Sequence, residues 1–282
     1  MEHIRELRAR IIRSALAVGI CFIIAWVFRG DLLYVLKKPL LDALAANPQA
    51  PHGVLLLKVM EKFFVHLKVA LFGGLVLAAP YVIYQAWRFI DPAFYAHERK
   101  LALPFVLSSL FLFALGLSFC YFIMLPFAFN FLIHYSLDTS PGLLLPVFGV
   151  KTGRDTLQIA LSDHISLTIK LLLGFGFAFE TPLFIAMVSA TRIASWKWFS
   201  KRRGYALVIL AVLSAVLTPQ DPWSMLMMFG PLWALYEIGI ILAWIISRKR
   251  EDSDDEKKDD KEKENKKNKK ERPDTDESGP VG

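Results

Sequence analysis

The chain alternates between long apolar runs and short polar segments. The apolar runs predict six membrane-spanning helices, at about residues 11–28, 67–89, 101–125, 165–190, 205–217 and 223–247. The fifth run is short, because about 13 helical residues reach only about 20 Å, against a hydrocarbon core of about 30 Å. We therefore predict an all-α, polytopic membrane protein with a bundle of six transmembrane helices, in which the last two helices tilt or lie where the bilayer is thin.

The polar segments between these runs predict the rest of the organisation. Residues 3–13 form an amphipathic start, with apolar side chains on one helical face and arginines on the other. Residues 31–65 are predicted to form an outside loop, broken at Pro39, and the third span is expected to end at Pro126. The sequence therefore predicts a membrane domain at 1–247, followed by a disordered, charged cytoplasmic tail at 248–282.

Basic residues are concentrated in alternate connections. Fifteen Lys and Arg side chains fall in the predicted inside segments, whereas seven fall in the outside loops. Because cytoplasmic segments are enriched in Lys and Arg, both termini are predicted to be cytoplasmic. The net charge is +7, of which residues 1–247 carry +8, so the basic excess belongs to the membrane domain. This favours contact with anionic membrane lipid, and no nucleic-acid partner is expected.

The motifs of common enzyme classes do not occur in the sequence. The chain contains no phosphate-binding loop of the Walker type and no G-x-S-x-G motif. His97-Glu98 begins an H-E-x-x-H pattern, but Leu101 stands where the second histidine is needed. The six histidines are scattered. We therefore predict a protein that is not an enzyme and that has no catalytic residue, cofactor or metal site.

Two carboxylates, Glu6 and Glu98, lie in the predicted inside segments. Each has a local explanation, because Glu6 can pair with Arg10 for about 0.3–0.5 kcal/mol. An acid at a helix amino terminus, such as Glu98, contributes about 0.3–1 kcal/mol. Their shared place on a basic membrane face with aromatic residues favours a second role, since carboxylates bind guanidinium groups in a bidentate manner.

Two further carboxylates, Glu180 and Glu237, lie inside predicted spans. A charge near the bilayer centre costs about 2.5–3.5 kcal/mol, so such acids suggest a function. Pro182 strengthens the case for Glu180, because it frees backbone groups next to the acid. Each acid could instead be protonated, or hydrogen-bonded for packing. From these residues alone, a proton-coupled secondary transporter is the alternative function, although no internal repeat supports it.

Several motifs together resemble those of one family. The amino terminus contains His3-Ile4-Arg5-Glu6-Leu7-Arg8, and a second motif follows the second span. Its matching positions are Pro80, Tyr84, Gln85, Trp87, Phe89, Pro92, Tyr95, Glu98, Arg99 and Lys100. Later matches are Phe179-Glu180, Pro182, Thr218-Pro219, Asp221, Pro231 and Tyr236-Glu237. Over about residues 3–247 the chain resembles TatC, the multispanning receptor of the twin-arginine protein translocase.

The resemblance implies a cytoplasmic site for the twin-arginine signal peptides of folded proteins. The residues that it implies for this site are Glu6, Glu98, Arg8, Tyr95 and Arg99. It also implies single-span partners of the TatA and TatB type, self-association in a receptor complex, and transport driven by the proton-motive force. The distribution of basic residues fits the bacterial inner membrane more simply than the membrane of an organelle descended from a bacterium. Intramembrane polar contacts with these partners would fall to Glu180, Glu237 and Asp221.

The chain departs from the family pattern at a few positions. Gln220 replaces the second proline of the turn before the sixth span, and Met225 replaces a glutamine early in that span. Ala93 stands where glycine is common, and Lys170 lies unexpectedly inside the fourth span. The change at Met225 bears on a polar partner contact at that position and does not affect the two acids implied for the signal-peptide site.

Overall fold

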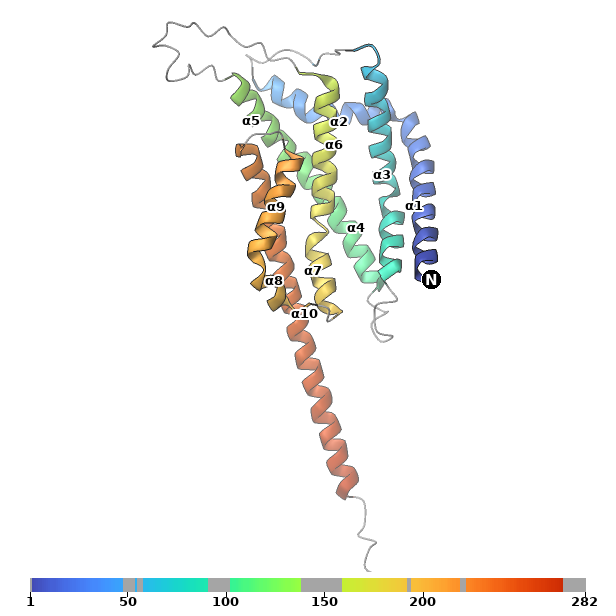
Figure 1. Ribbon diagram of the computed structural model, residues 1–282, viewed down its shortest axis with the longest axis vertical. Coiled ribbons are helices and arrows are strands. Elements are labelled where there is room, and N and C mark those ends of the chain that lie inside the picture. Colours follow the sequence, from blue (N-terminus) through green and yellow to red (C-terminus); the bar gives the residue numbers. More distant parts are fainter. Residues whose placement is uncertain are drawn as a thin grey trace, which may run out of the picture.

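The structure is a computed structural model that describes residues 2–47, 54, 58–90, 102–137, 159–191, 194–218 and 222–270. Helices make up nearly all of this part of the chain (Figure 1). In order they are α1 (Glu2–Val27), α2 (Arg29–Ala45), α3 (Glu61–Ile90), α4 (Ala102–Phe119), the π-helix η3 (Cys120–Met124), α5 (Leu125–Leu137), α6 (Leu161–Ala178), α7 (Thr181–Ala190), α8 (Trp196–Lys201), α9 (Arg203–Leu217) and α10 (Pro222–Lys270).

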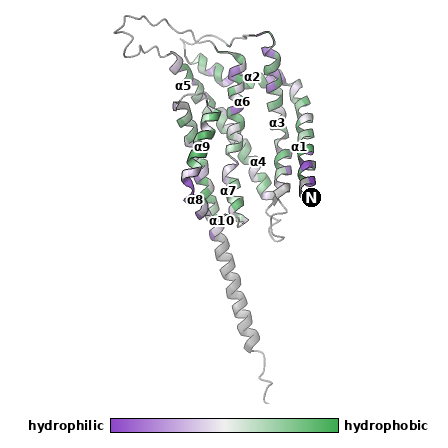
Figure 2. Cartoon of the chain, in the orientation of Figure 1, coloured by the Kyte–Doolittle hydropathy of each residue, from purple (hydrophilic) through white to green (hydrophobic). Residues whose placement is uncertain are grey.

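Five helical segments are long and apolar enough to cross a membrane. They are Arg5–Val27, Glu61–Arg88, Pro104–Ser136, Leu161–Ala190 and Met225–Arg248. The shorter apolar helix Arg203–Leu217 brings the set to six, and apolar residues dominate along all of these segments (Figure 2). The prediction of an all-α bundle of six apolar helices is therefore confirmed, while the levels at which the bilayer begins and ends stay a prediction.

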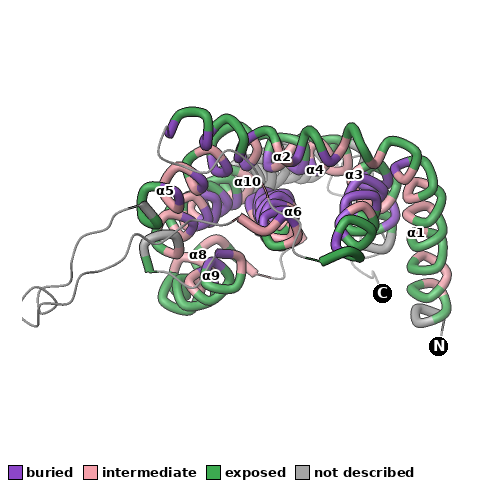
Figure 3. The backbone as a smooth tube through the Cα atoms, turned by 90° about the horizontal axis from the view of Figure 1, so that it is seen from above, coloured by how far each residue is buried: buried purple, intermediate pink, exposed green. Residues whose placement is uncertain are grey.

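The segment α6–α7 is the most buried of these spans. α3 and α4 pack against α6, α1 packs along α3, and α10 packs against α7 and α9. Viewed from above, α6 lies at the centre with buried side chains, whereas α1 is exposed along most of its length (Figure 3). The core side chains come from distant parts of the sequence and include Val69, Leu125, Ile165, Phe175 and Leu232. Because lipid covers the outer helices, the exposed apolar side chains of α1 are expected.

The prediction of an outside loop is wrong for residues 31–45, because these residues belong to helix α2. This helix lies across one end of the bundle, and its buried side chains recur at helical spacing (Figure 1). Pro39 sits inside it, although proline lacks the N–H that would bond to the carbonyl four residues earlier. That carbonyl, on Val35, accepts a hydrogen bond of 3.0 Å from the Tyr121 hydroxyl instead. The tertiary contact thus compensates for the proline.

Pro126 does not end the third span, contrary to the sequence prediction. α4, η3 and α5 follow one another without a break and run diagonally across the bundle (Figure 1). The π-helix lies directly before Pro126. Its wider turn changes the hydrogen-bond spacing at the point where a proline ring would clash with the preceding turn. The helix therefore continues past Pro126 to Leu137.

The predicted disordered tail differs from the structure over residues 248–270. These residues continue α10 beyond the bundle (Figure 1), and residues 271–282 lie outside the described part. Lys and Glu are good helix formers, and acids precede lysines by four residues several times in this segment. The first proline after the bundle is Pro273, so nothing in the sequence interrupts the helix earlier.

Candidate functional site

Glu6 lies in the second turn of α1, at the end of the bundle that we call the amino-terminal end. Its carboxylate forms an ion pair with Arg10, one helical turn further along the same face. This is the local pair that the sequence suggests. The Glu6 side chain is 39% exposed, and Arg8 is exposed beside it. A charged group from outside can therefore reach this carboxylate.

Glu98, Tyr95, Arg99 and Asp221 lie outside the described residues. Even so, α3 ends at Ile90 and α4 begins at Ala102, and both of these helix ends lie beside the start of α1 (Figure 1). The two helix ends that flank residues 91–101 therefore lie at the amino-terminal end, and the shared location of Glu6 and Glu98 stays a prediction.

Arginine–aromatic pairs surround this same end of the bundle. In three of them the guanidinium lies over a ring, at 4.0 to 5.9 Å from its centroid: Arg88 over Tyr84, Arg202 over Trp198, and Arg248 over Trp244. Cation–π contacts of this kind hold a charged group at the edge of an apolar region. The pairs belong to α3, α8 and α10, so this end carries a basic rim with aromatic residues, as is typical of a membrane surface.

Glu180 occupies the turn between α6 and α7, in the middle of the apolar span Leu161–Ala190. Its Oε2 accepts a hydrogen bond of 2.6 Å from the Ser109 hydroxyl of α4, and Ser109 is only 2% exposed. Its other oxygen, Oε1, is buried and has no hydrogen-bond partner in the described part of the chain. Pro182 stands at the start of α7, which explains the break in the helix. The structure therefore places a single, partly satisfied carboxyl group inside the bundle.

Sequence reasoning missed the partner of Glu180. Ser109 is a polar residue inside an apolar span, but nothing in the sequence indicates that it contacts an acid 71 residues later. The two meet because α4 and α6 approach closely at Gly116. A Cβ atom on Gly116 would lie 2.7 Å from the carbonyl oxygen of Phe175 and 2.9 Å from the Phe179 side chain. Glycine at this position therefore allows the close approach of the two helices.

Glu237 pairs with a basic residue of the neighbouring helix. Its Oε2 accepts a hydrogen bond of 2.8 Å from Arg203 at the start of α9, and both side chains are partly exposed. The adjacent Tyr236 donates its hydroxyl to the backbone carbonyl of Phe199, at 3.0 Å. These contacts join α8 and α9 to α10. Glu180 and Glu237 thus have separate partners on separate helix pairs.

The described residues do not form a set of ligands for a metal ion. No group of three His, Cys, Asp or Glu side chains in that part of the chain is placed to hold a metal ion. Cys21 and Cys120 are free thiols on different helices.

Comparison with known proteins identifies the family. The family model described as Sec-independent protein translocase protein (TatC) matches residues 2–231. The TatC protein of Desulforapulum autotrophicum is 36% identical over 256 residues, covering 91% of this chain and 87% of that protein. The TatC protein of Aquifex aeolicus is 35% identical over 251 residues, covering 89% of this chain and 97% of that protein.

A solved structure agrees with these matches. The crystal structure of the twin arginine translocase receptor TatC superposes with a TM-score of 0.72, at 32% identity, and covers 87% of this chain and 99% of that one. The same all-helical bundle is thus shared by two chains whose sequences are related throughout. This chain therefore belongs to the TatC family of Sec-independent protein translocase proteins, and it is a multi-pass membrane subunit of a protein transport system rather than an enzyme.

Proposed function

We propose that this chain is the receptor subunit that binds twin-arginine signal peptides at its cytoplasmic face, with Glu6 and Glu98 as the acids that contact the two arginines. The observation that carries the proposal is the position of Glu6, an accessible carboxylate at the end of the bundle where the two helix ends that flank residues 91–101 also lie. Family membership supports it, since a related solved structure is described as a twin arginine translocase receptor.

The chemistry at Glu6 fits an arginine ligand. A carboxylate has about four lone-pair positions, and the Glu6 side chain is partly exposed, so a guanidinium from outside can reach this carboxylate. Arginine presents a planar fork of donors that matches a carboxylate, whereas lysine presents a single point charge. Arg8, Tyr95 and Arg99 complete the proposed site, where they set its basic character and position the peptide.

The proposal extends to the transport machinery. The chain acts with single-span partners of the TatA and TatB type, associates with further copies of itself, and uses the proton-motive force, with both termini on the cytoplasmic side of the bacterial inner membrane. The excess of Lys and Arg in alternate connections supports this orientation. Glu180, with one buried oxygen unpartnered in the described part of the chain, is the intramembrane group that we propose contacts a partner helix when the bundle opens.

Two other intramembrane contacts are included in the proposal with different support. Glu237 already pairs with Arg203, which favours a role in holding α9 against α10. Asp221 lies outside the described residues, and its proposed role rests on the family motif alone. A proton-coupled transporter of small molecules is not retained as an alternative, because the chain belongs to a family of protein translocase subunits.

Peptide binding to the purified full-length protein in detergent tests the proposal. A labelled signal peptide with Arg-Arg is compared with the same peptide carrying Lys-Lys, using the wild type, Glu6→Ala and Glu98→Ala. Losing a buried guanidinium–carboxylate pair costs about 2–5 kcal/mol, which is at least roughly a thirtyfold loss of affinity. The matched control is Asp42→Asn, an exposed acid on α2 at the opposite end. Equal binding of both peptides would exclude the two acids as readers of the motif.

A further inference from the structure

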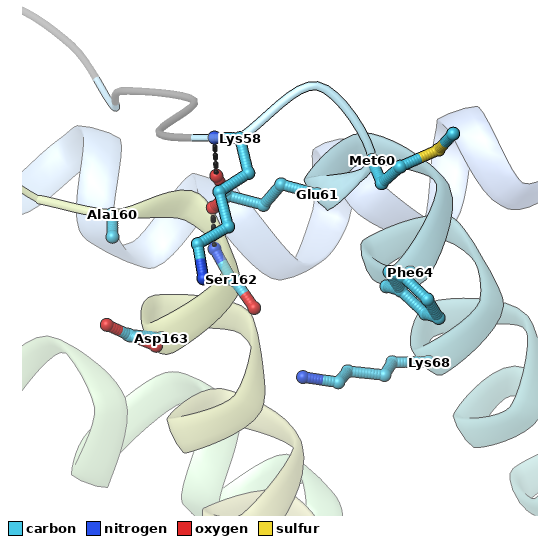
Figure 4. Close-up of a pocket in the computed structure, with 8 residues that line it drawn as sticks. All are labelled: Lys58, Met60, Glu61, Phe64, Lys68, Ala160, Ser162 and Asp163. Carbon is cyan, nitrogen blue, oxygen red and sulfur yellow. Dashed lines mark hydrogen bonds between the residues drawn. The ribbon is translucent and has the colours of Figure 1, made fainter.

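A cavity of about 510 Å³ lies at the opposite end of the bundle, where α3 and α6 begin (Figure 4). Its walls come from the segment before α3, from the first turns of α3 and from the start of α6. The lining residues are Lys58, Met60, Glu61, Phe64, Lys68, Ala160, Ser162 and Asp163. The proposed signal-peptide site lies at the other end of these helices, so the cavity has no part in it.

Glu61 builds one wall of the cavity. Its carboxylate accepts hydrogen bonds from the backbone N–H groups of Ser162, at 2.8 Å, and Lys58, at 3.1 Å (Figure 4). Glu61 is buried, so it joins the segment before α3 to the first turn of α6. Both backbone donors are therefore already engaged, and the charged side chains are the groups left to contact a ligand.

Charges of both signs line the cavity. The Lys58 and Lys68 side chains belong to its α3 side, and Asp163 lines it from α6 with its carboxylate drawn on the side of that helix away from Lys68 (Figure 4). Lys68 donates a hydrogen bond of 2.8 Å to the Ser166 hydroxyl, which holds its side chain across the gap between the helices. Within the described part of the chain, the Lys58 ammonium and the Asp163 carboxylate have no ion-pair or hydrogen-bond partner.

The apolar part of the lining points to a ligand with a hydrocarbon chain. Met60 is 67% exposed and Phe64 is 54% exposed, and both line the cavity. The cavity also lies where the apolar segments Glu61–Arg88 and Leu161–Ala190 begin, which is the level of a membrane surface. A phospholipid has its headgroup at this level and its chains beside the helices.

We propose that this cavity binds the headgroup of a zwitterionic phospholipid of the phosphoethanolamine type. The phosphate lies between Lys58 and Lys68, the primary ammonium donates to Asp163, and an acyl chain lies against Phe64. Two lysines and two acids line the cavity, so its formal charge is balanced. A headgroup that carries both charges matches this lining, whereas a purely anionic headgroup would leave the Asp163 carboxylate facing a like charge. This site is additional to the proposed function of the chain.

Native mass spectrometry of the full-length protein in detergent tests the site. Phosphatidylethanolamine, phosphatidylglycerol and phosphatidylcholine with identical chains are titrated in separate arms. The variants are Lys68→Gln and Asp163→Asn, and the matched controls are Lys170→Gln, an exposed lysine further along α6, and Asp42→Asn. Soluble glycerophosphoethanolamine is added in a competition arm, because it carries the same headgroup without acyl chains. Circular dichroism confirms that each variant keeps its helical content.

The expected result is a preference for phosphatidylethanolamine over both other lipids in the wild type. Each cavity variant should lower its binding by about three- to fivefold, the effect of an exposed charge pair, and Asp163→Asn should also raise binding of phosphatidylglycerol. The control variants should bind as the wild type does. Equal or better binding of phosphatidylglycerol or phosphatidylcholine, equal losses in the controls, or no competition by an excess of the soluble headgroup would overturn the proposal.

Discussion

Replacing Gly116 with alanine tests how closely α4 and α6 pack. The added Cβ would meet three atoms within 3.0 Å: the Phe175 carbonyl oxygen at 2.7 Å, and the Cβ and Cγ atoms of Phe179 at 2.9 Å. The carbonyl oxygen belongs to the backbone of α6 and cannot rotate away. Gly116→Ala must therefore push α4 away from α6 by several tenths of an ångström.

The energetic cost follows from these contacts. Overpacking a filled site costs about 1–3 kcal/mol. Alanine regains up to about 1 kcal/mol through its higher helix propensity. The expected net loss is about 1–2 kcal/mol, which lowers the unfolding midpoint of a chain of this size by roughly 2–6 °C. Because Ser109 lies two helical turns before Gly116, the same displacement should lengthen its 2.6 Å bond to Glu180.

Thermal unfolding in detergent, followed by intrinsic fluorescence, measures the stability of the variant. The matched control is Gly19→Ala on α1, because a Cβ at Gly19 would meet nothing within 4 Å. This control should unfold at the wild-type temperature or slightly above it. A Gly116→Ala protein that unfolds together with Gly19→Ala would show that the close approach of α4 and α6 is wrong, and with it the packing that joins Ser109 to Glu180.

Three further predictions concern polar contacts, measured by the same unfolding assay. Glu61→Ala should cost about 2–4 kcal/mol, because two backbone donors lose a charged acceptor, and Glu61→Gln should cost less; equal losses would contradict this. Tyr121→Phe should cost about 0.5–1.5 kcal/mol and speed hydrogen exchange in α2, so unchanged exchange would argue against the contact. A double-mutant cycle of Arg203→Gln and Glu237→Gln should give a coupling energy of up to about 1 kcal/mol. Additive effects of the two substitutions on stability would contradict the ion pair.

The apolar pattern predicts the membrane-spanning helices of this chain, because each isolated helix must be apolar to lie in a bilayer. It fails at α2, where the decisive interaction is tertiary. A proline in a short amphipathic segment usually ends a helix, and the hydroxyl that satisfies the Val35 carbonyl comes from Tyr121, 86 residues away. The helix end predicted at Pro126 is wrong for a similar reason, because a π-helical turn before it accommodates the proline. Rules based on local sequence predict too many helix breaks, because they do not include the tertiary contacts that supply a missing hydrogen-bond partner.

The candidate sites divide in the same way. Motif spacing indicates Glu6, Glu98 and Glu180 because each lies in a recognisable sequence context. The cavity bounded by Lys58, Lys68 and Asp163 gives no such signal, since its two sides are about 100 residues apart and meet only when Glu61 bonds to the backbone of α6. Charged residues at the ends of spans are common, so only their convergence on one cavity distinguishes these from solvated side chains.

The position of Glu180 shows how the bundle can keep a carboxyl group at membrane depth. Irregular backbone is tolerated there only where protein surrounds it, and the break between α6 and α7 meets this condition. On one side Gly116 brings α4 within contact; on the other, a Cβ at Gly239 of α10 would lie 3.0 Å from the backbone of Pro182. The break between α6 and α7 is thus flanked by two close helix contacts, with α4 against the end of α6 and α10 against the start of α7. Ser109 satisfies one of its oxygens, and the other is buried without a hydrogen-bond partner in the described part of the chain, so the contact proposed for the translocase partners requires the helices around Glu180 to move apart.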